Sequence, residues 1–73
     1  MEQIISYPIL AGKNLRLLIH TYYISQEAFA IDYGADLRTV NRYINEGINK
    51  ISVIQELAEF FNTDFIFFFQ NHE

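Results

Sequence analysis

Apolar residues recur with the period of an α-helix along most of the chain. In the first half, apolar residues at i, i+3, i+4 and i+7 predict a helix over 11–22: Leu15, Leu18, Ile19 and Tyr22. In the second half, a similar spacing predicts a helix over 53–61: Ile54, Leu57, Ala58 and Phe61. Strand-like alternation is found only weakly, over residues 3–7. The pattern therefore predicts an all-α fold.

Two shorter helices are expected between these runs, because capping residues mark their ends. Ser25 precedes a helical run over 26–33 and is a preferred N-cap, and Gly34 follows it and can adopt the left-handed conformation that ends a helix. Asp36 is the next N-cap candidate, in front of a helix over 37–45. The apolar stripe of that helix consists of Leu37, Val40 and Ile44.

The two ends of the chain are less regular. Pro8 follows a short apolar run, so residues 1–10 are expected to form a leader or arm ahead of the first helix. The segment 52–55 (Ser-Val-Ile-Gln) fits a capping box, which places the start of the fourth helix at residue 53. A short fifth helix is expected within 64–73, which we interpret as an interface helix and tail.

Composition limits the chain to one small domain. Its 73 residues allow a single domain over 1–73, a compact bundle of four or five helices. A core of this size supplies only about 3–5 kcal/mol. There is no cysteine for a disulfide or a cysteine-based zinc site, and the two histidines, His20 and His72, are far apart in the sequence. We therefore expect no metal and no cofactor.

Several functional classes lack their sequence signatures. No apolar run reaches the roughly 18–20 residues of a membrane span, and the N-terminus lacks the basic region of a secretory signal. A cytoplasmic protein without membrane contact is therefore expected. The chain also has no glycine-rich phosphate loop, no nucleophile motif and no acid–base pair close in the sequence. We therefore expect a protein that is not an enzyme.

The segment 25–47 carries the chemistry that points to a function. Its two helices are joined by two or three residues, and so short a link forces the steep crossing of a helix-turn-helix. The residues expected to form the turn and its packing are Ala30, Gly34, Val40 and Tyr43. With Val40 and Tyr43 turned inward, the opposite face of the second helix carries Arg38, Asn41, Arg42 and Asn45. Arginine pairs with guanine or phosphate and asparagine with adenine, so this face is suited to DNA.

This arrangement resembles the Cro/repressor-type, XRE-like helix-turn-helix family. The positions that match the family motif, in order, are Ser25-Gln26-Glu27, Ala30, Gly34, Val40 and Tyr43. The resemblance continues outward in Asn14-Leu15-Arg16 and in the run 57–63 (Leu-Ala-Glu-Phe-Phe-Asn-Thr), so it covers 12–69. It implies a lambda-repressor-like domain that binds specific DNA sequences as a transcriptional regulator of the repressor type, and that acts as a homodimer.

The resemblance also assigns residues to double-stranded DNA. It implies base contacts in the major groove from Arg38, Asn41 and Arg42, and phosphate contacts from Gln26, Asn45 and Lys50. All five basic residues lie between positions 13 and 50 together with four acids, a local net charge of +1, and the other five acids lie outside that stretch. This asymmetry fits a DNA-facing side with an acidic back. The net charge of −4 predicts weak, salt-dependent DNA binding.

The C-terminal region suggests a second surface, and it leaves an alternative function open. Five consecutive apolar residues over 65–69 cannot all face one way on a helix, and exposed aromatic patches mark interfaces. We expect this Phe-rich end to form a homodimer interface or to bind a protein partner, through Phe65, Phe68 and Phe69. The alternative function is a protein-interaction or oligomerisation module, antirepressor- or antitoxin-like, that does not bind DNA. Arg38 and Arg42 would then be solvated charges that pair with Asp36 or Glu46.

Overall fold

The computed structural model describes residues 6–72 of the chain. Their order is α1 (Tyr7–Tyr22), α2 (Gln26–Tyr33), α3 (Leu37–Glu46), α4 (Ile51–Phe60) and the 3₁₀ helix η1 (Phe65–Phe69). No strand is found within 6–72, so the predicted all-α fold is confirmed for this part of the chain.

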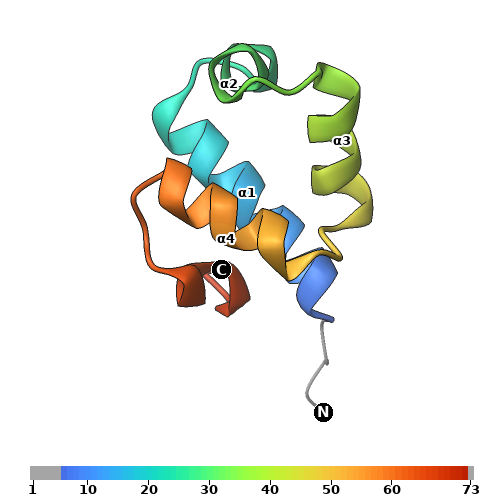
Figure 1. The fold of residues 1–73 in the computed structure, drawn as a ribbon, viewed down its shortest axis with the longest axis vertical. Helices are drawn as coiled ribbons and strands as arrows, with labels where there is room; N and C mark the ends of the chain where they lie inside the picture. Colours follow the sequence, from blue (N-terminus) through green and yellow to red (C-terminus); the bar gives the residue numbers. More distant parts are fainter. Residues whose placement is uncertain (1–5, 73) are drawn as a thin grey trace.

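The helix α1 is the centre of the arrangement. It packs against α2, α3 and η1, and α4 packs on η1 (Figure 1). In the view of Figure 1, α2 lies at the top, α3 on the right, and η1 at the lower left below α4. All five elements contribute to one core, which is formed by Ala11, Leu15, Leu18, Ile19, Phe29, Ala30, Val40, Ile54, Leu57, Ala58 and Phe68, with Ile48 from the α3–α4 turn.

The first helix begins earlier than predicted. Pro8 lies in the first turn of α1, where its missing N–H would have no partner in any case, so the proline starts the helix instead of separating a leader from it. The prediction of a leader over 1–10 is therefore wrong for residues 7–10, and residues 1–5 lie outside the described part. This early turn matters for α3, because the Pro8 carbonyl accepts a hydrogen bond of 2.9 Å from the Ile48 N–H.

The fourth helix also begins earlier than predicted. Its N-cap is Lys50, whose backbone carbonyl accepts from the N–H groups of Val53 and Ile54 at 3.1 and 3.2 Å. Ser52 therefore lies within the first turn, and the capping box predicted for it does not form. At the other end, Asn62 adopts a positive φ of 54° and reverses the chain, a conformation that asparagine tolerates better than most residues. This reversal directs η1 back beneath α4 and α1.

The Phe-rich segment is only partly a surface. Phe68 is fully buried in the core, so its predicted place in a homodimer interface is wrong. The reason is a pair of long-range hydrogen bonds: the side-chain amide of Asn14 donates to the carbonyls of Phe67 and Gln70 at 3.0 and 2.8 Å. These bonds fix η1 against α1 and turn Phe68 inward. Phe65 is 36% exposed and Phe69 is partly buried, so these two residues remain candidates for an interface.

Two glycines allow α1 and α3 to approach closely. A Cβ atom on Gly12 would lie 2.3 Å from the Tyr43 carbonyl oxygen, so no larger residue fits without moving the backbone. Gly47 ends α3 at a φ of 102°, and a Cβ there would lie 2.7 Å from the Pro8 carbonyl. The C-terminal end of α3 is thus set directly on the first turns of α1.

Candidate nucleic-acid interface

The helix α2 has a hydrogen-bonded cap at each end. At its start, the Ala28 N–H donates to the hydroxyl of Ser25 at 3.0 Å. At its end, Gly34 takes the left-handed conformation with a φ of 88°, and the N–H groups of Gly34 and Ala35 both donate to the Ala30 carbonyl. The helix over 26–33 therefore has the predicted bounds, and residues 34–36 form the turn to α3.

The helix α3 begins at a charged cap. The Thr39 N–H donates to a carboxylate oxygen of Asp36 at 2.7 Å, as predicted for an N-cap. Hydrogen bonds from Thr39 hold the pKa of Asp36 below its ordinary value of 3.8, and the positive charge of Arg38 adds to this effect. Asp36 is therefore a carboxylate at neutral pH, and it partly offsets the charge of Arg38.

An aromatic cluster packs on the inner side of the corner between α2 and α3. Phe29 is fully buried, and its ring stacks on the rings of Tyr33 and Phe61 at centroid distances of 5.3 and 5.4 Å. The Tyr33 hydroxyl donates to Glu56 at 3.4 Å, and burial together with the Glu56 charge raises the pKa of Tyr33 to about 12. Tyr33 thus stays neutral and ties α2 to α4.

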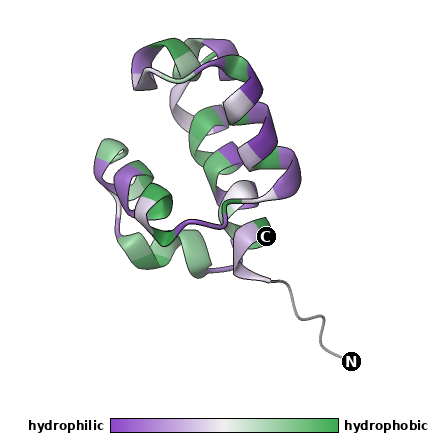
Figure 2. Ribbon diagram, turned by 45° about the vertical axis from the view of Figure 1, so that its right-hand side comes forward, coloured by the Kyte–Doolittle hydropathy of each residue, from purple (hydrophilic) through white to green (hydrophobic). Residues whose placement is uncertain are grey.

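The predicted packing residues lie on the inner side of α2 and α3. Ala30 and Val40 are buried, and Tyr43 packs against the same core from a half-buried position. Hydrophilic residues, purple in Figure 2, recur along α3, whereas residues 65–69 are green along their length. The outer face of α3 consists of four exposed residues, namely Arg38, Asn41, Arg42 and Asn45.

Leu37 also lies at the surface, at the start of α3. Its side chain is 37% exposed, so this apolar residue adjoins the polar face and does not join the core. The surface that α3 presents is therefore polar along most of its length, with one apolar residue at its N-terminal end.

A hollow of about 360 Å³ lies beside this face, between α3 and the start of α4. It brings Arg42 together with Lys50, two residues that are eight positions apart in the sequence. Thr39 and Asn49 line the same hollow but were not singled out from the sequence. The position of Thr39, three residues before Arg42 on one helix, was the signal that could have identified it. Glu46 also lines the hollow, so one carboxylate faces the two basic side chains.

The remaining predicted phosphate contact comes from another element. Gln26 is the first residue of α2 and is half-buried. It does not line the hollow that holds Lys50 and Arg42. The structure thus distributes the predicted DNA-contacting residues over α2, α3 and the start of α4.

The chain matches no known protein family, curated protein or solved structure.

Two further features concern residues 6–72. No group of three or more metal-ligating side chains comes together among these residues. In the same part of the chain, no helix has the length and apolar character needed to cross a membrane.

Proposed function

We propose that the protein is a sequence-specific DNA-binding transcriptional regulator that inserts α3 into the major groove as a homodimer. The observation that carries this proposal is the two-sided character of α3. Its inner side is buried at Val40, its start is capped by Asp36, and its outer face carries two arginines and two asparagines that are all exposed. The resemblance of 12–69 to the Cro/repressor-type family supports the same function, with DNA in the cytoplasm as the partner and without a cofactor.

The dimensions and side chains of α3 suit a DNA groove. Ten residues span about 15 Å, and the major groove, about 12 Å wide, admits a helix. Arg38 and Arg42 provide the bidentate donors that read guanine, and Asn41 provides the amide that reads adenine. Leu37 adds an apolar contact of the kind that thymine methyl groups accept.

Phosphate contacts would flank this helix. Lys50 and Arg42 share the hollow at the α3–α4 turn, and Gln26 stands at the start of α2. Glu46 in the hollow and Asp36 at the cap repel phosphate, so the net attraction is small. We therefore expect binding that weakens steeply as the salt concentration rises.

The homodimer is proposed to form through Phe65 and Phe69. Their rings lie 4.9 Å apart, and the ring of Phe69 lies 6.0 Å from that of Tyr7. The Tyr7 hydroxyl donates to the Asn49 carbonyl at 2.8 Å, so this apolar end borders the α3–α4 turn. A two-fold axis through this end would relate the α3 helices of the two copies, and a dimer of this kind reads two half-sites about 34–36 Å apart. Sedimentation at high micromolar concentration is expected to show a dimer, and a monomer would contradict this arrangement.

The test is a selection of bound sequences from a random pool of DNA duplexes at low salt. After an operator is selected, Arg42→Ala and Asn41→Ala are each expected to weaken its binding by about 1–3 kcal/mol and to relax the preference at one base pair. The control Arg16→Ala removes the same charge from α1, and we expect it to leave the base preference unchanged. If both variants of α3 bind the selected operator as tightly as the parent, the assigned face is wrong.

A protein-interaction module is the second candidate, and one observation favours it. Ile66 is 58% exposed next to Phe65, so the Phe-rich end offers an apolar surface to another protein, in a chain whose net charge is −4. Under this function no duplex is enriched from the pool at any salt concentration. An enriched sequence would exclude it as the sole function.

A further inference from the structure

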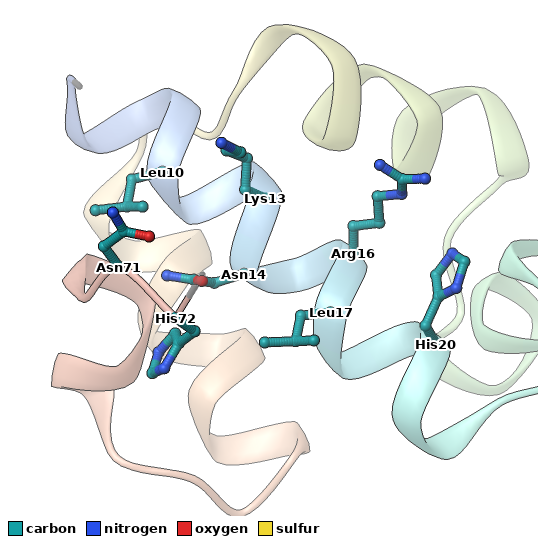
Figure 3. Close-up of a pocket in the computed structure, with 8 residues that line it drawn as sticks. All are labelled: Leu10, Lys13, Asn14, Arg16, Leu17, His20, Asn71 and His72. Atoms are coloured by element: carbon teal, nitrogen blue, oxygen red, sulfur yellow. The ribbon is translucent and has the colours of Figure 1, made fainter. Parts of the chain in front are cut away.

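We propose that a groove along α1 binds a small organic anion with an apolar body. The groove has a volume of about 270 Å³ and lies between the exposed face of α1 and the chain that follows η1. Four of its lining residues can carry a positive charge, and they are Lys13, Arg16, His20 and His72 (Figure 3). This site lies on α1, outside the face of α3 to which the function above is assigned, so the inference does not rest on that function.

The wall contributed by the C-terminal chain is held by defined contacts. The Asn14 amide donates to the carbonyls of Phe67 and Gln70. Nε2 of His72 lies 2.9 Å from the same Phe67 carbonyl, and because a carbonyl only accepts, this nitrogen carries a proton. The His72 ring stacks on the Phe67 ring at a centroid distance of 4.1 Å. The groove is thus bounded by two segments that are joined to each other.

Its charge is the opposite of that of the chain as a whole. The chain has nine acidic residues and five basic ones, yet two of the five basic residues and both histidines line this one groove. Within residues 6–72, no aspartate or glutamate is among its lining residues. The side chains of Lys13, Arg16 and His20 point the same way from α1, at spacings of three and four residues that bring them onto one side of the helix (Figure 3). A carboxylate or phosphate group placed there meets cationic donors from α1.

The rest of the lining selects for an apolar body. Leu17 is 43% exposed and lies beside His72, and Leu10 lines the groove beside Asn71 (Figure 3). Binding sites for small molecules usually have volumes of about 300–1,000 Å³, so this groove is suited to a ligand near the lower end of that range. A short fatty acid, which combines one carboxylate with an apolar chain, matches both properties.

The test is a titration of the ¹⁵N-labelled chain with hexanoate, followed by NMR chemical shifts without DNA. We expect saturable shifts at the amides of Leu17, His20 and His72. The probe 1-hexanol has the same chain without the charge, and inorganic phosphate has the charge without the chain. Both are expected to bind at least about fivefold more weakly, because each lacks one of the two contacts.

A matched pair of variants assigns the anion to the groove. Arg16→Gln is expected to weaken hexanoate binding by about fivefold, whereas Arg38→Gln removes the same charge from α3 and is expected to leave it unchanged. Both arginines are exposed, so circular dichroism should show folded protein for each variant. Equal binding of hexanoate and 1-hexanol, equal effects of the two variants, or no shift at the three amides would each overturn the proposal. None of these outcomes depends on whether the protein binds an operator.

Discussion

The α2–α3 corner and the C-terminal end of the molecule are held by hydrogen bonds of very different range. At the corner, the caps of Ser25 and Asp36 join residues three positions apart, and Gly34 bonds to a residue four positions before it. At the C-terminal end, Asn14 bonds to carbonyls 53 and 56 positions away. The corner is therefore specified locally, whereas the position of η1 depends on a distant residue of α1.

The largest expected effect lies at the C-terminal end. Phe68→Ala empties a fully buried site and is expected to cost about 3–5 kcal/mol, which is close to the entire stability of a domain of this size. Phe65→Ala is the matched control on the partly exposed side of η1, with an expected cost below about 1 kcal/mol. Urea unfolding measures both variants. Similar losses for the two would mean that η1 is not docked as described.

The next effect compares Gly12, at the contact between α1 and α3, with Gly34, in the turn between α2 and α3. Gly12→Ala is expected to cost about 3 kcal/mol, because its Cβ would collide with the Tyr43 carbonyl. At Gly34 no atom lies within 4 Å of a Cβ, so Gly34→Ala loses only about 1 kcal/mol through its positive φ, and Gly34→Val loses more. Thermal unfolding ranks the three variants. A milder effect at Gly12 than at Gly34 would contradict the close approach of α1 and α3.

A smaller loss of stability is expected when the two hydrogen bonds of Asn14 to η1 and Gln70 are removed. Asn14→Leu keeps the approximate size of the side chain but removes both donated hydrogen bonds. The Gln70 carbonyl loses the Asn14 donor, and the Phe67 carbonyl keeps only its bonds from Gln70 and His72. We expect a loss of about 1–3 kcal/mol and faster hydrogen exchange in η1 than in α2. Asn41→Leu, on the exposed face of α3, is the control and should leave the stability unchanged. Equal hydrogen-exchange rates in η1 and α2 would show that the C-terminal end and the α2–α3 corner unfold together.

The smallest effect is the pH dependence of the α3 cap. Because its hydrogen bonds to Thr39 lower the pKa of Asp36, the folded state binds this proton less readily than the unfolded state does. The stabilisation by the cap is therefore present above pH 3.8 and is lost as the pH falls through the lowered pKa. Asp36→Asn retains a capping oxygen and should remove this part of the acid dependence. If the stability measured by unfolding between pH 2 and pH 6 changes equally for the parent and this variant, the cap is not the source of the acid dependence.

The same difference in range explains which features could be predicted from the sequence. The bounds of α2 and the start of α3 follow from Ser25, Gly34 and Asp36, because each acts on backbone groups within a few residues of itself. The exposure of Arg38, Asn41, Arg42 and Asn45 follows from the helical period once Val40 is assigned to the core. Local chemistry was sufficient for both.

The features that were missed depend on contacts between distant segments. The sequence does not show that Asn14 meets η1, so nothing local separates the buried Phe68 from the partly exposed Phe65. Gly12 lies within a helix and has no local signature, and only the approach of Tyr43 explains it. The groove along α1 was missed for the same reason, because His72 and Arg16 line one groove only after η1 docks.

The junction between α3 and α1 determines how the molecule would meet a partner. The Ile48–Pro8 and Tyr7–Asn49 hydrogen bonds and the close contact at Gly12 would all be disturbed if α3 tilted relative to α1. The helix is thus presented in one preformed orientation, and little conformational entropy is left to lose on association. Under the proposed DNA-binding function, a duplex that does not match this orientation would have to bend or change its groove width, so base steps that the protein never touches would influence its choice of sequence.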